Sequence, residues 1–289
     1  MSPVNPTNNS PIFESYVESW TGEATVMAAL EKMNINPQTT INISFCSFAF
    51  NSGSALPGLQ FAATSQGNAQ ALKAIVAYVH SHGGKVKISF GGATYPFAQY
   101  AAQIGPKQLA ADVTNVIKEY NLDGVDLDIE DNESLTSGVV PFMQSLAKDL
   151  PGKTISLTVP GQDWSAQSWI TACAPYATSI NFMEYDIWQG GGDPTKVNIA
   201  QVEQDIMTYI NQWGIPAGKI HLGLMPGEDD MQANLTLAQA TELAEWAKSQ
   251  GLGGVMIWDA DRDFGGIDGN APLAYTNAIE NILDNVSKK

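Results

Sequence analysis

Basic residues are scarce in this sequence. Lysine and arginine together number 14, against 30 aspartates and glutamates in 289 residues, which gives a formal net charge of -16. Nucleic acids and anionic membrane surfaces are bound by lysines and arginines that neutralise phosphates. We therefore expect no nucleic-acid partner, whereas a neutral ligand is compatible with the charge. Long apolar runs are lacking too: none approaches the roughly 20 residues that cross a membrane, so no membrane partner is expected.

Cysteine and histidine are equally scarce. Cys46 lies in an apolar strand-like run and Cys173 in a helical one, which predicts buried free thiols rather than a disulfide. His80 and His82 are two apart on an expected helix and so lie on different faces, which disfavours a metal pair. His221 sits in a strand, where a core position is expected. Without a Ser/His or Cys/His arrangement, hydrolysis by such a nucleophile is disfavoured, and neither a metal nor another cofactor is expected.

Targeting signals and domain boundaries are also lacking. The first twenty residues have neither the basic nor the apolar region of a signal peptide. Residues 1–10, with two prolines and three asparagines, predict a loose N-terminal tail. Residues 11–289 predict one domain, because a chain of this length that is 44% hydrophobic suffices for one large core and is short for two. No repeat or linker marks a second module.

Short strand-like segments alternate with helical ones from end to end. Strands are expected at 12–17, 41–48, 86–90, 123–128, 154–159, 179–183, 220–225 and 254–258. Amphipathic helices are expected between them, for example at 69–82, 106–120 and 236–250. Eight strand-helix units predict an α/β fold, a single (β/α)8 TIM barrel. A doubly wound open sheet is the alternative, but no glycine-rich phosphate turn follows the first strand.

The most informative segment is an acidic run in the fourth expected strand. Asp126, Asp128 and Glu130 are spaced two apart, so they share one face of the strand while the apolar residues between them fill the other. Like charges this close cannot all ionise at neutral pH, so one acid keeps a proton and can act as a general acid. This is the chemistry of glycoside cleavage. Glu130 falls just past the strand end, where a barrel places catalytic residues.

Two other interpretations of the acidic run stay open. A solvated loop is one, but a loop would not alternate acids with valine, leucine and isoleucine. A divalent-metal site is the other, since carboxylates are the usual ligands of hard cations. Known calcium loops, however, place their acids in a glycine-containing turn rather than along a strand.

Short motifs recur at the ends of other expected strands. They are Tyr16 in the first strand, Ser89-Phe90-Gly91-Gly92 ending the third, Met183-Glu184-Tyr185-Asp186 ending the sixth and Trp258 ending the eighth. The run from Asp123 to Glu130 matches the pattern DGxDxDxE, and the third-strand and sixth-strand motifs are similar to SxGG and MxYD. These are signatures of glycoside hydrolase family 18, the chitinases. They occur in family order from residue 16 to residue 258, so the sequence resembles that family over most of its length.

The resemblance implies substrate-assisted hydrolysis with retention at the anomeric carbon. The 2-acetamido oxygen of the sugar attacks its own anomeric carbon, so no enzyme nucleophile is needed. Glu130 is implied as the catalytic acid and base, Asp128 as the group that stabilises the positive oxazolinium, and Tyr185 as a donor to the acetamido oxygen. Asp126 is implied to share a proton with Asp128.

Substrate binding is implied for further motif residues. Asp186 would help to bind the distorted sugar, and Trp258 would form the apolar floor beneath it, because a pyranose presents C–H faces that stack on aromatic rings. Tyr16 and Met183 belong to the same substrate-binding group. Three loop aromatics that follow the third, fifth and sixth strands are expected to line outer subsites: Tyr95, Trp164 and Trp188.

Other motif positions carry structural expectations. Ser89, Gly91 and Gly92 are expected to act by packing and close backbone approach rather than by direct catalysis. Asp123 begins the strand with the opposite parity to the three acids, which predicts a turn or capping role. Gly124 belongs to the same structural part of the motif.

The resemblance implies a hydrolase that cleaves β-1,4-linked N-acetylglucosamine polymers, chitin and its oligosaccharides, and we expect a monomer. Two alternatives stay open. A chitinase-like lectin would keep the barrel without the activity, but such proteins commonly lack the last acid of the signature, here Glu130. An endo-β-N-acetylglucosaminidase acting on N-glycan cores shares the acid run, but such relatives generally replace the aspartate found here as Asp186.

The connection between the seventh and eighth strands bears on how the polymer is cut. Exo-acting family members commonly carry an α+β subdomain there. Only 28 residues separate Met225 from Gly254, so no α+β insertion is expected, and the groove should be open and suited to endo attack. A polymer substrate of this kind implies a secreted or extracellular protein. Export would then be non-classical or use a leader that this chain does not carry.

Overall fold

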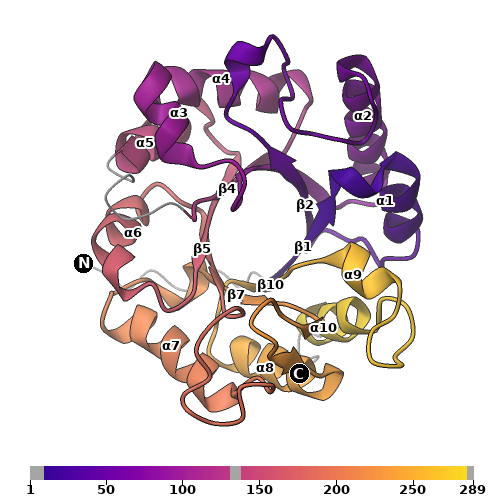
Figure 1. The fold of residues 1–289 in the computed structure, drawn as a ribbon, viewed down its shortest axis with the longest axis vertical. Coiled ribbons are helices and arrows are strands. Elements are labelled where there is room, and N and C mark those ends of the chain that lie inside the picture. Colours follow the sequence, from indigo (N-terminus) through magenta and orange to yellow (C-terminus); the bar gives the residue numbers. More distant parts are fainter. Residues whose placement is uncertain (1–9, 131–137, 285–289) are drawn as a thin grey trace.

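The computed structural model of the chain describes residues 10–130 and 138–284. Eight parallel strands close into a barrel, and the helices lie around its outside (Figure 1). The predicted (β/α)8 TIM barrel is therefore confirmed. The predicted loose tail, apart from Ser10, lies outside the described residues.

The barrel strands follow one another in chain order around the ring, and the last one closes against the first. Their bounds are β1 Ile12–Glu18, β2 Thr39–Cys46, β3 Lys85–Gly91, β4 Gly124–Asp128, β5 Thr154–Pro160, β6 Ser179–Met183, β7 Ile220–Leu224 and β10 Gly254–Ile257. Each predicted strand agrees with these bounds to within two residues at either end. Parallel pairing throughout places all the strand carboxyl ends, and the loops that follow them, at one mouth of the barrel.

The outer layer is helical. Its helices are α1 Glu23–Leu30, α2 Ser65–Ser81, α3 Phe97–Ile104, α4 Pro106–Glu119, α5 Val139–Asp149, α6 Gln167–Cys173, α7 Ile199–Asn211, α8 Leu237–Ser249, α9 Ala260–Phe264 and α10 Ala274–Asp284. Short 3-10 helices occur at Ser19–Thr21, Phe50–Ser52, Trp164–Ala166 and Ala217–Lys219. The helices predicted at 69–82, 106–120 and 236–250 are confirmed as α2, α4 and α8.

Local sequence sets where these helices begin. Thr64 precedes α2, and its side chain accepts a hydrogen bond from the backbone N–H of Gly67. Thr236 and Gln239 form a reciprocal capping box at the start of α8. Pro106 occupies the first turn of α4, where its missing N–H has no helical acceptor to lose. Each cap fixes the point at which a loop returns to the helical layer.

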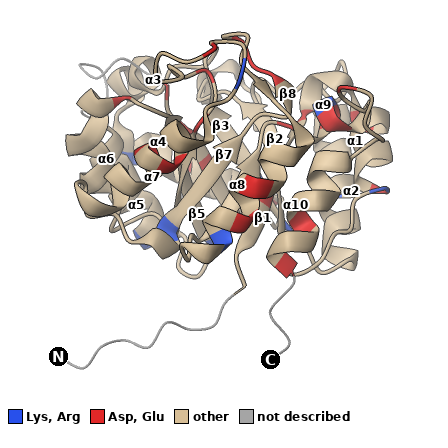
Figure 2. Cartoon of the chain, turned by 90° about the horizontal axis from the view of Figure 1, so that it is seen from below, with Lys and Arg blue, Asp and Glu red and all other residues tan. Residues whose placement is uncertain are grey.

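The connection between β7 and β10 is short. It holds a two-residue antiparallel hairpin, β8 (Gly227–Glu228) with β9 (Asn234–Leu235), followed by α8. No α+β subdomain stands between these strands, so that prediction is confirmed. The hairpin lies at the mouth of the barrel, where it contributes to one wall of the site described below (Figure 2).

The two faces of β4 have opposite chemistry, as its alternation predicts. Val125 and Leu127 are fully buried members of the apolar layer between barrel and helices. Asp126 and Asp128 point the other way, into the barrel, and are also buried. Both cysteines are buried free thiols, as predicted.

Charge is distributed unevenly over the described chain. Figure 2 shows few lysines and arginines and many acidic residues, including acidic segments at the end of the barrel that carries β8 and α9. Such an end repels polyanions. Among the described helices, none combines the length and apolar character needed to cross a membrane.

Gly124 gives a test of the close strand packing at the base of β4. A Cβ atom at this position would lie 2.0 Å from the carbonyl oxygen of Thr154 on β5, so the two strands would have to move apart. We expect Gly124→Ala to lower the free energy of unfolding by about 2 to 3 kcal/mol. Gly218→Ala is the matched control, because nothing lies within 4 Å of a Cβ there. Denaturant unfolding measures both, and equal stability of the two variants would contradict this packing.

Candidate active site

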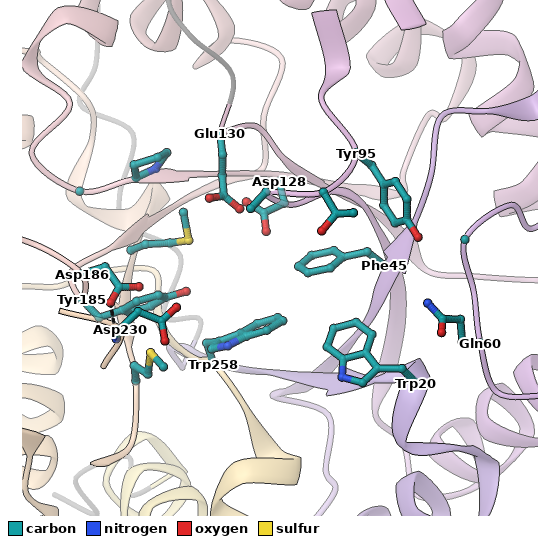
Figure 3. A pocket seen from close by; sticks show the side chains of 17 residues that line it. Trp20, Phe45, Gln60, Tyr95, Asp128, Glu130, Tyr185, Asp186, Asp230 and Trp258 are labelled. Atoms are coloured by element: carbon teal, nitrogen blue, oxygen red, sulfur yellow. Dashed lines mark hydrogen bonds between the residues drawn. The ribbon is translucent and has the colours of Figure 1, made fainter. Parts of the chain in front are cut away.

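A cavity of about 630 Å³ opens at the carboxyl ends of the barrel strands. Figure 3 shows Glu130 and Asp128 facing the cavity from the top and Tyr185, Asp186 and Asp230 facing it from the left, with aromatic rings at the bottom and right. The acidic lining residues are Asp128, Glu130, Asp186 and Asp230. The aromatic lining residues are Trp20, Phe45, Tyr95, Tyr185 and Trp258. No lysine or arginine lines this cavity among the described residues, so it suits a neutral ligand with apolar faces.

Asp126 lies inside the barrel with no exposed surface. Its Oδ2 accepts hydrogen bonds from the hydroxyls of Tyr16 and Ser89, each at 2.6 Å. Its Oδ1 accepts from the hydroxyls of Ser156, at 2.5 Å, and Thr158, at 2.9 Å. A carboxylate offers about four acceptor positions, so four hydroxyls satisfy it completely. Asp126 is therefore held in place as a hydrogen-bond acceptor for side chains from three other strands.

Asp128, two residues further along β4, has the opposite environment. It is 4% exposed, and its Oδ1 has no hydrogen-bond partner among the described residues. Burial, followed by the like charges of Glu130 and Asp126, raises the pKa of Asp128 well above its usual range. Asp128 therefore holds its proton to a higher pH than an ordinary aspartate does.

The proton sharing expected between the two aspartates stays a prediction. Among the described residues, no hydrogen bond joins Asp126 to Asp128, and hydroxyls contact both oxygens of Asp126. The sequence could not reveal these hydroxyls, since they come from three other strands.

Tyr16 needs a correction for the same reason. It was expected to bind substrate, but it is 1% exposed, does not line the cavity and donates its hydroxyl to Asp126. Burial and then the charge of Asp126 raise the pKa of Tyr16 well above its usual value, so it remains a donor. Tyr16 thus supports the acidic run from below.

Glu130 lies two residues past the end of β4, exposed at the mouth of the barrel. In Figure 3 its carboxyl group points toward Asp128 and the cavity. An acid that is accessible to a ligand yet adjacent to a buried one is placed for proton transfer. The structure therefore puts Glu130, Asp128 and Asp126 in a line from the cavity to the barrel interior.

Tyr185 and Asp186 face the acids from the end of β6. Burial, then the charges of Asp128 and Glu130, raise the pKa of Tyr185 well above its usual value, so its hydroxyl stays a donor at neutral pH. Asp186 has a left-handed backbone, with φ of 54°. Its Oδ1 accepts from the backbone N–H of Asp230 at 2.7 Å, while its own N–H donates to Asp229 at 2.9 Å. These bonds tie the loop after β6 to the β8–β9 hairpin.

Stacked aromatic rings form the floor and right-hand wall of the cavity in Figure 3. Trp258 follows β10, and its ring stacks on Phe45 with a centroid distance of 5.3 Å. Trp20 stacks on the same Phe45 at 6.1 Å and is 43% exposed. Tyr16 meets Trp258 edge-on at 5.3 Å. The wall offers flat apolar surface to a sugar ring.

Hydrogen bonds to Asp261 anchor this wall from the side. The backbone N–H of Glu18, which ends β1, donates to Asp261 Oδ2 at 2.7 Å, and the hydroxyl of Thr21 donates to Asp261 Oδ1 at 3.1 Å. Burial raises the pKa of Asp259, and the charge of Glu18 adds to the effect. Asp261 therefore holds the loop after β1 against the segment that follows β10.

The structural motif residues lie where close backbone contacts require them. A Cβ on Gly91 would lie 1.9 Å from the carbonyl oxygen of Asp128, and Gly92 has φ of 71° with the Phe45 ring close by. Asp123 precedes β4. Its Oδ2 accepts from the backbone N–H of Val86 at 2.9 Å, which is a capping contact.

The loop aromatics divide into two groups. Tyr95 lines the cavity, as does Met183 at the end of β6. Trp164 and Trp188, also expected to line outer subsites, are not part of this cavity. Trp164 packs beside Tyr209, with ring centroids 5.6 Å apart, and Trp188 is 63% exposed in the loop after β6.

Sequence reasoning missed several lining residues. Trp20 lies two residues past β1, so its position after a strand could have drawn attention to it. Phe45 alternates with buried residues in β2 and carries no motif. Gln60 and Asp230 come from loops, where no periodicity indicates direction. Among the described residues, no group of three or more His, Cys, Asp or Glu side chains is arranged to hold a metal ion.

Comparison with known proteins places this architecture in a family. The family model described as "Glycosyl hydrolases family 18" matches residues 13–234. A curated relative, "Secreted chitinase LysM12" of Penicillium expansum, is 29% identical over 178 residues, which cover 49% of this chain. That match covers only 12% of the fungal protein, so the chain corresponds to a small part of its relative.

Solved structures share the fold over nearly the whole chain. A chitinase from Bacteroides thetaiotaomicron superposes with a TM-score of 0.77 at 18% identity, covering 97% of this chain and 99% of that one. Active domain 2 of a thermostable chitinase from Pyrococcus furiosus, solved with chito-oligosaccharides, gives 0.76 at 19% identity and covers 97% of each chain. Together with the family match over most of the sequence, these findings lead to one conclusion. The chain belongs to glycosyl hydrolase family 18.

Proposed function

We propose that the protein hydrolyses β-1,4-linked N-acetylglucosamine polymers, chitin and its oligosaccharides, with retention of anomeric configuration and with assistance from the substrate. The observation that carries this proposal is the graded acidic run at the end of β4. Asp126 accepts hydrogen bonds from four hydroxyls, Asp128 above it is buried with a raised pKa, and Glu130 is exposed to the cavity. The family membership and the fungal relative named a secreted chitinase support the same substrate class.

The proposed reaction begins with proton transfer from Glu130 to the glycosidic oxygen, which lets the leaving sugar depart. The acetamido oxygen of the remaining sugar attacks its own anomeric carbon and forms a cyclic oxazolinium. Glu130, now a carboxylate, takes a proton from water as that water attacks the same carbon. The ring opens, the acetamido group is restored and Glu130 regains its proton.

Asp128 would act at the stage where positive charge develops. Its carboxyl group turns toward the acetamido N–H and Glu130 and orients the acetamido oxygen for attack. Once Glu130 has protonated the leaving group, Asp128 shares its own proton with the Glu130 carboxylate and so places negative charge beside the oxazolinium. Tyr185 donates its hydroxyl to the acetamido oxygen from the opposite side. Asp186 helps to bind the distorted sugar over Trp258, and Met183 contributes to the wall.

The shape of the site favours endo attack. The connection from β7 to β10 holds only a hairpin and one helix, so no subdomain rises beside the cavity. A long chain could then lie across the barrel mouth, with Trp20 and Tyr95 beyond the central sugar. We propose that the protein acts outside the cell, where such polymers occur, and that it acts as a monomer.

Hydrolysis products decide between this function and its alternatives. Chitin hexamer and a biantennary N-glycan should be offered side by side, with products separated by chromatography. We expect shorter N-acetylglucosamine oligomers from internal cleavage and an intact N-glycan. Cleavage of the N-glycan core alone would replace chitin with that substrate. Binding of the hexamer without cleavage would show that the protein is a lectin rather than an enzyme.

Glu130→Gln tests the proton donor. The amide preserves shape but cannot donate the proton, so we expect kcat to fall by a factor of about 10² to 10⁴ while hexamer binding and thermal unfolding stay near wild type. Steady-state kinetics and calorimetry measure these properties. A turnover rate within tenfold of wild type would remove Glu130 from the mechanism.

Asp128→Asn tests the charge beside the acetamido group. The change keeps shape and one hydrogen bond, so we expect kcat to fall by about 10² to 10³. The direction of the pH effect follows from the raised pKa of Asp128, because the coupled wild-type acids hold a proton to a pH above the usual carboxyl range. In the variant, the acid that remains no longer has to ionise beside a second carboxylate, so it loses its proton at a lower pH. The alkaline limb of kcat/KM should therefore move to lower pH. Normal kcat with an unmoved limb would refute this role.

A further inference from the structure

The barrel interior below the acidic run contains a lysine that the proposed mechanism does not use. Lys87 lies on β3 and is 1% exposed. Its Nζ donates to Glu14 Oε1 on β1 at 2.9 Å and to the hydroxyl of Ser156 on β5 at 2.6 Å. A buried ammonium is costly unless it is paired and hydrogen-bonded, so these two contacts fix the position of the Lys87 ammonium group.

The hydrogen bonds from Lys87 to the acidic run have a fixed direction. An ammonium group can only donate, so the Ser156 oxygen must accept from it. Ser156 has one proton, and that proton points to Asp126 Oδ1 at 2.5 Å. The chain therefore runs one way, from the cation on β3 through a hydroxyl on β5 to the anion on β4. Each bond polarises the next and strengthens negative charge on Asp126.

Glu14 balances the lysine without disturbing Asp126. Its Oε2 accepts from the side-chain amides of Asn42 and Asn181, at 3.1 Å and 3.0 Å. Burial alone would raise the pKa of Glu14, but the charges of Lys87 and His221 hold it well below its usual range. Glu14 is thus an anion on the far side of the lysine, and the cation remains directed toward Ser156.

The charged and titratable groups that interact with Asp126 or belong to the network connected to it come from four strands. They are Tyr16 and Glu14 on β1, Lys87 on β3, Asp128 on β4 and His221 on β7. Lys87 has the hydrogen-bonded route to Asp126, whereas Asp128 has a buried oxygen with no partner among the described residues. A proton near this run is thus favoured on Asp128 and disfavoured on Asp126.

We propose that Lys87 is a positioning residue for the reaction: acting through Ser156, it keeps Asp126 ionised and so leaves the proton on Asp128. The inference rests on the proposed function, because it assigns Lys87 to the catalytic run of that site. It adds a buried group that does not line the cavity to the residues that set the protonation of the site.

The test uses two variants of the full chain. Lys87→Gln combined with Glu14→Gln removes both charges, so neither stays buried alone. Ser156→Ala cuts the bridge and leaves the charges in place. Lys219→Gln is the matched control, because Lys219 is a half-buried lysine with two carbonyl acceptors, Ala174 and Ala177, and no contact with this network. Circular dichroism and thermal unfolding establish that each variant folds.

The first readout is the pH dependence of chitin hexamer hydrolysis. Without the cation, Asp126 takes up a proton more readily, so the acidic limb of kcat/KM should move to higher pH. Ser156→Ala removes a hydrogen bond to a charged group, so we expect a shift of about one to two pH units in that variant. A smaller shift in the same direction is expected for the double variant, which keeps this bond and loses the cation behind it, and none for Lys219→Gln.

The second readout does not depend on hydrolysis. The infrared C=O band of protonated carboxyl groups is recorded in the free protein, and Asp126→Asn or Asp128→Asn identifies which acid contributes. We expect Asp128→Asn to remove a band in the wild type, and Asp126→Asn to remove one in the Lys87/Glu14 variant. Folded variants with an unmoved acidic limb and unchanged band assignment would overturn the proposal. If the double variant does not fold, Ser156→Ala decides alone. If the wild type cleaves no oligosaccharide, the proposed function fails while the infrared result still decides where the proton lies.

Discussion

The structure of this site depends on one constraint: carboxyl groups two residues apart on a barrel strand cannot all be ionised. Asp126 and Asp128 are both buried, where a charge is expensive. The fold gives the two carboxyl groups different hydrogen-bond environments. Four hydroxyls surround the deeper acid, and the next acid has an oxygen without a partner in the described chain, so it keeps its proton. The exposed acid at the strand end then has a protonated neighbour rather than a second charge.

The difference between these two environments requires a closed barrel. The hydroxyls come from β1, β3 and β5, and only a ring of strands brings these side chains to one point above β4. The same closure brings Phe45, Trp20 and Trp258 from opposite ends of the chain into one aromatic wall. The acids therefore provide the reactive groups, and the aromatic rings provide a surface for a sugar. Closure of the sheet fixes the position of the rings relative to the acids.

Much of the fold could be predicted from the sequence, because strand and helix periodicities are local properties. The acidic run could be predicted for the same reason: period two places Asp126, Asp128 and Glu130 on one face. The partners of these acids could not. Lys87 and Glu14 alternate with apolar residues in strands whose inward face is also buried, so the pattern does not say which side of β3 carries a cation. Tyr16 was predicted to bind substrate because the sequence indicates the strand in which it lies, but not how deep in the barrel its side chain is buried.

Neutron diffraction from a deuterated crystal of the free protein at neutral pH tests the central claim most directly, since it locates the protons of the acidic run. The account predicts a deuteron on the carboxyl group of Asp128. It also predicts none on Asp126, with hydroxyl deuterons of Tyr16, Ser89 and Ser156 directed at its two oxygens. A deuteron bonded to Asp126, with Asp128 bare, would contradict the account.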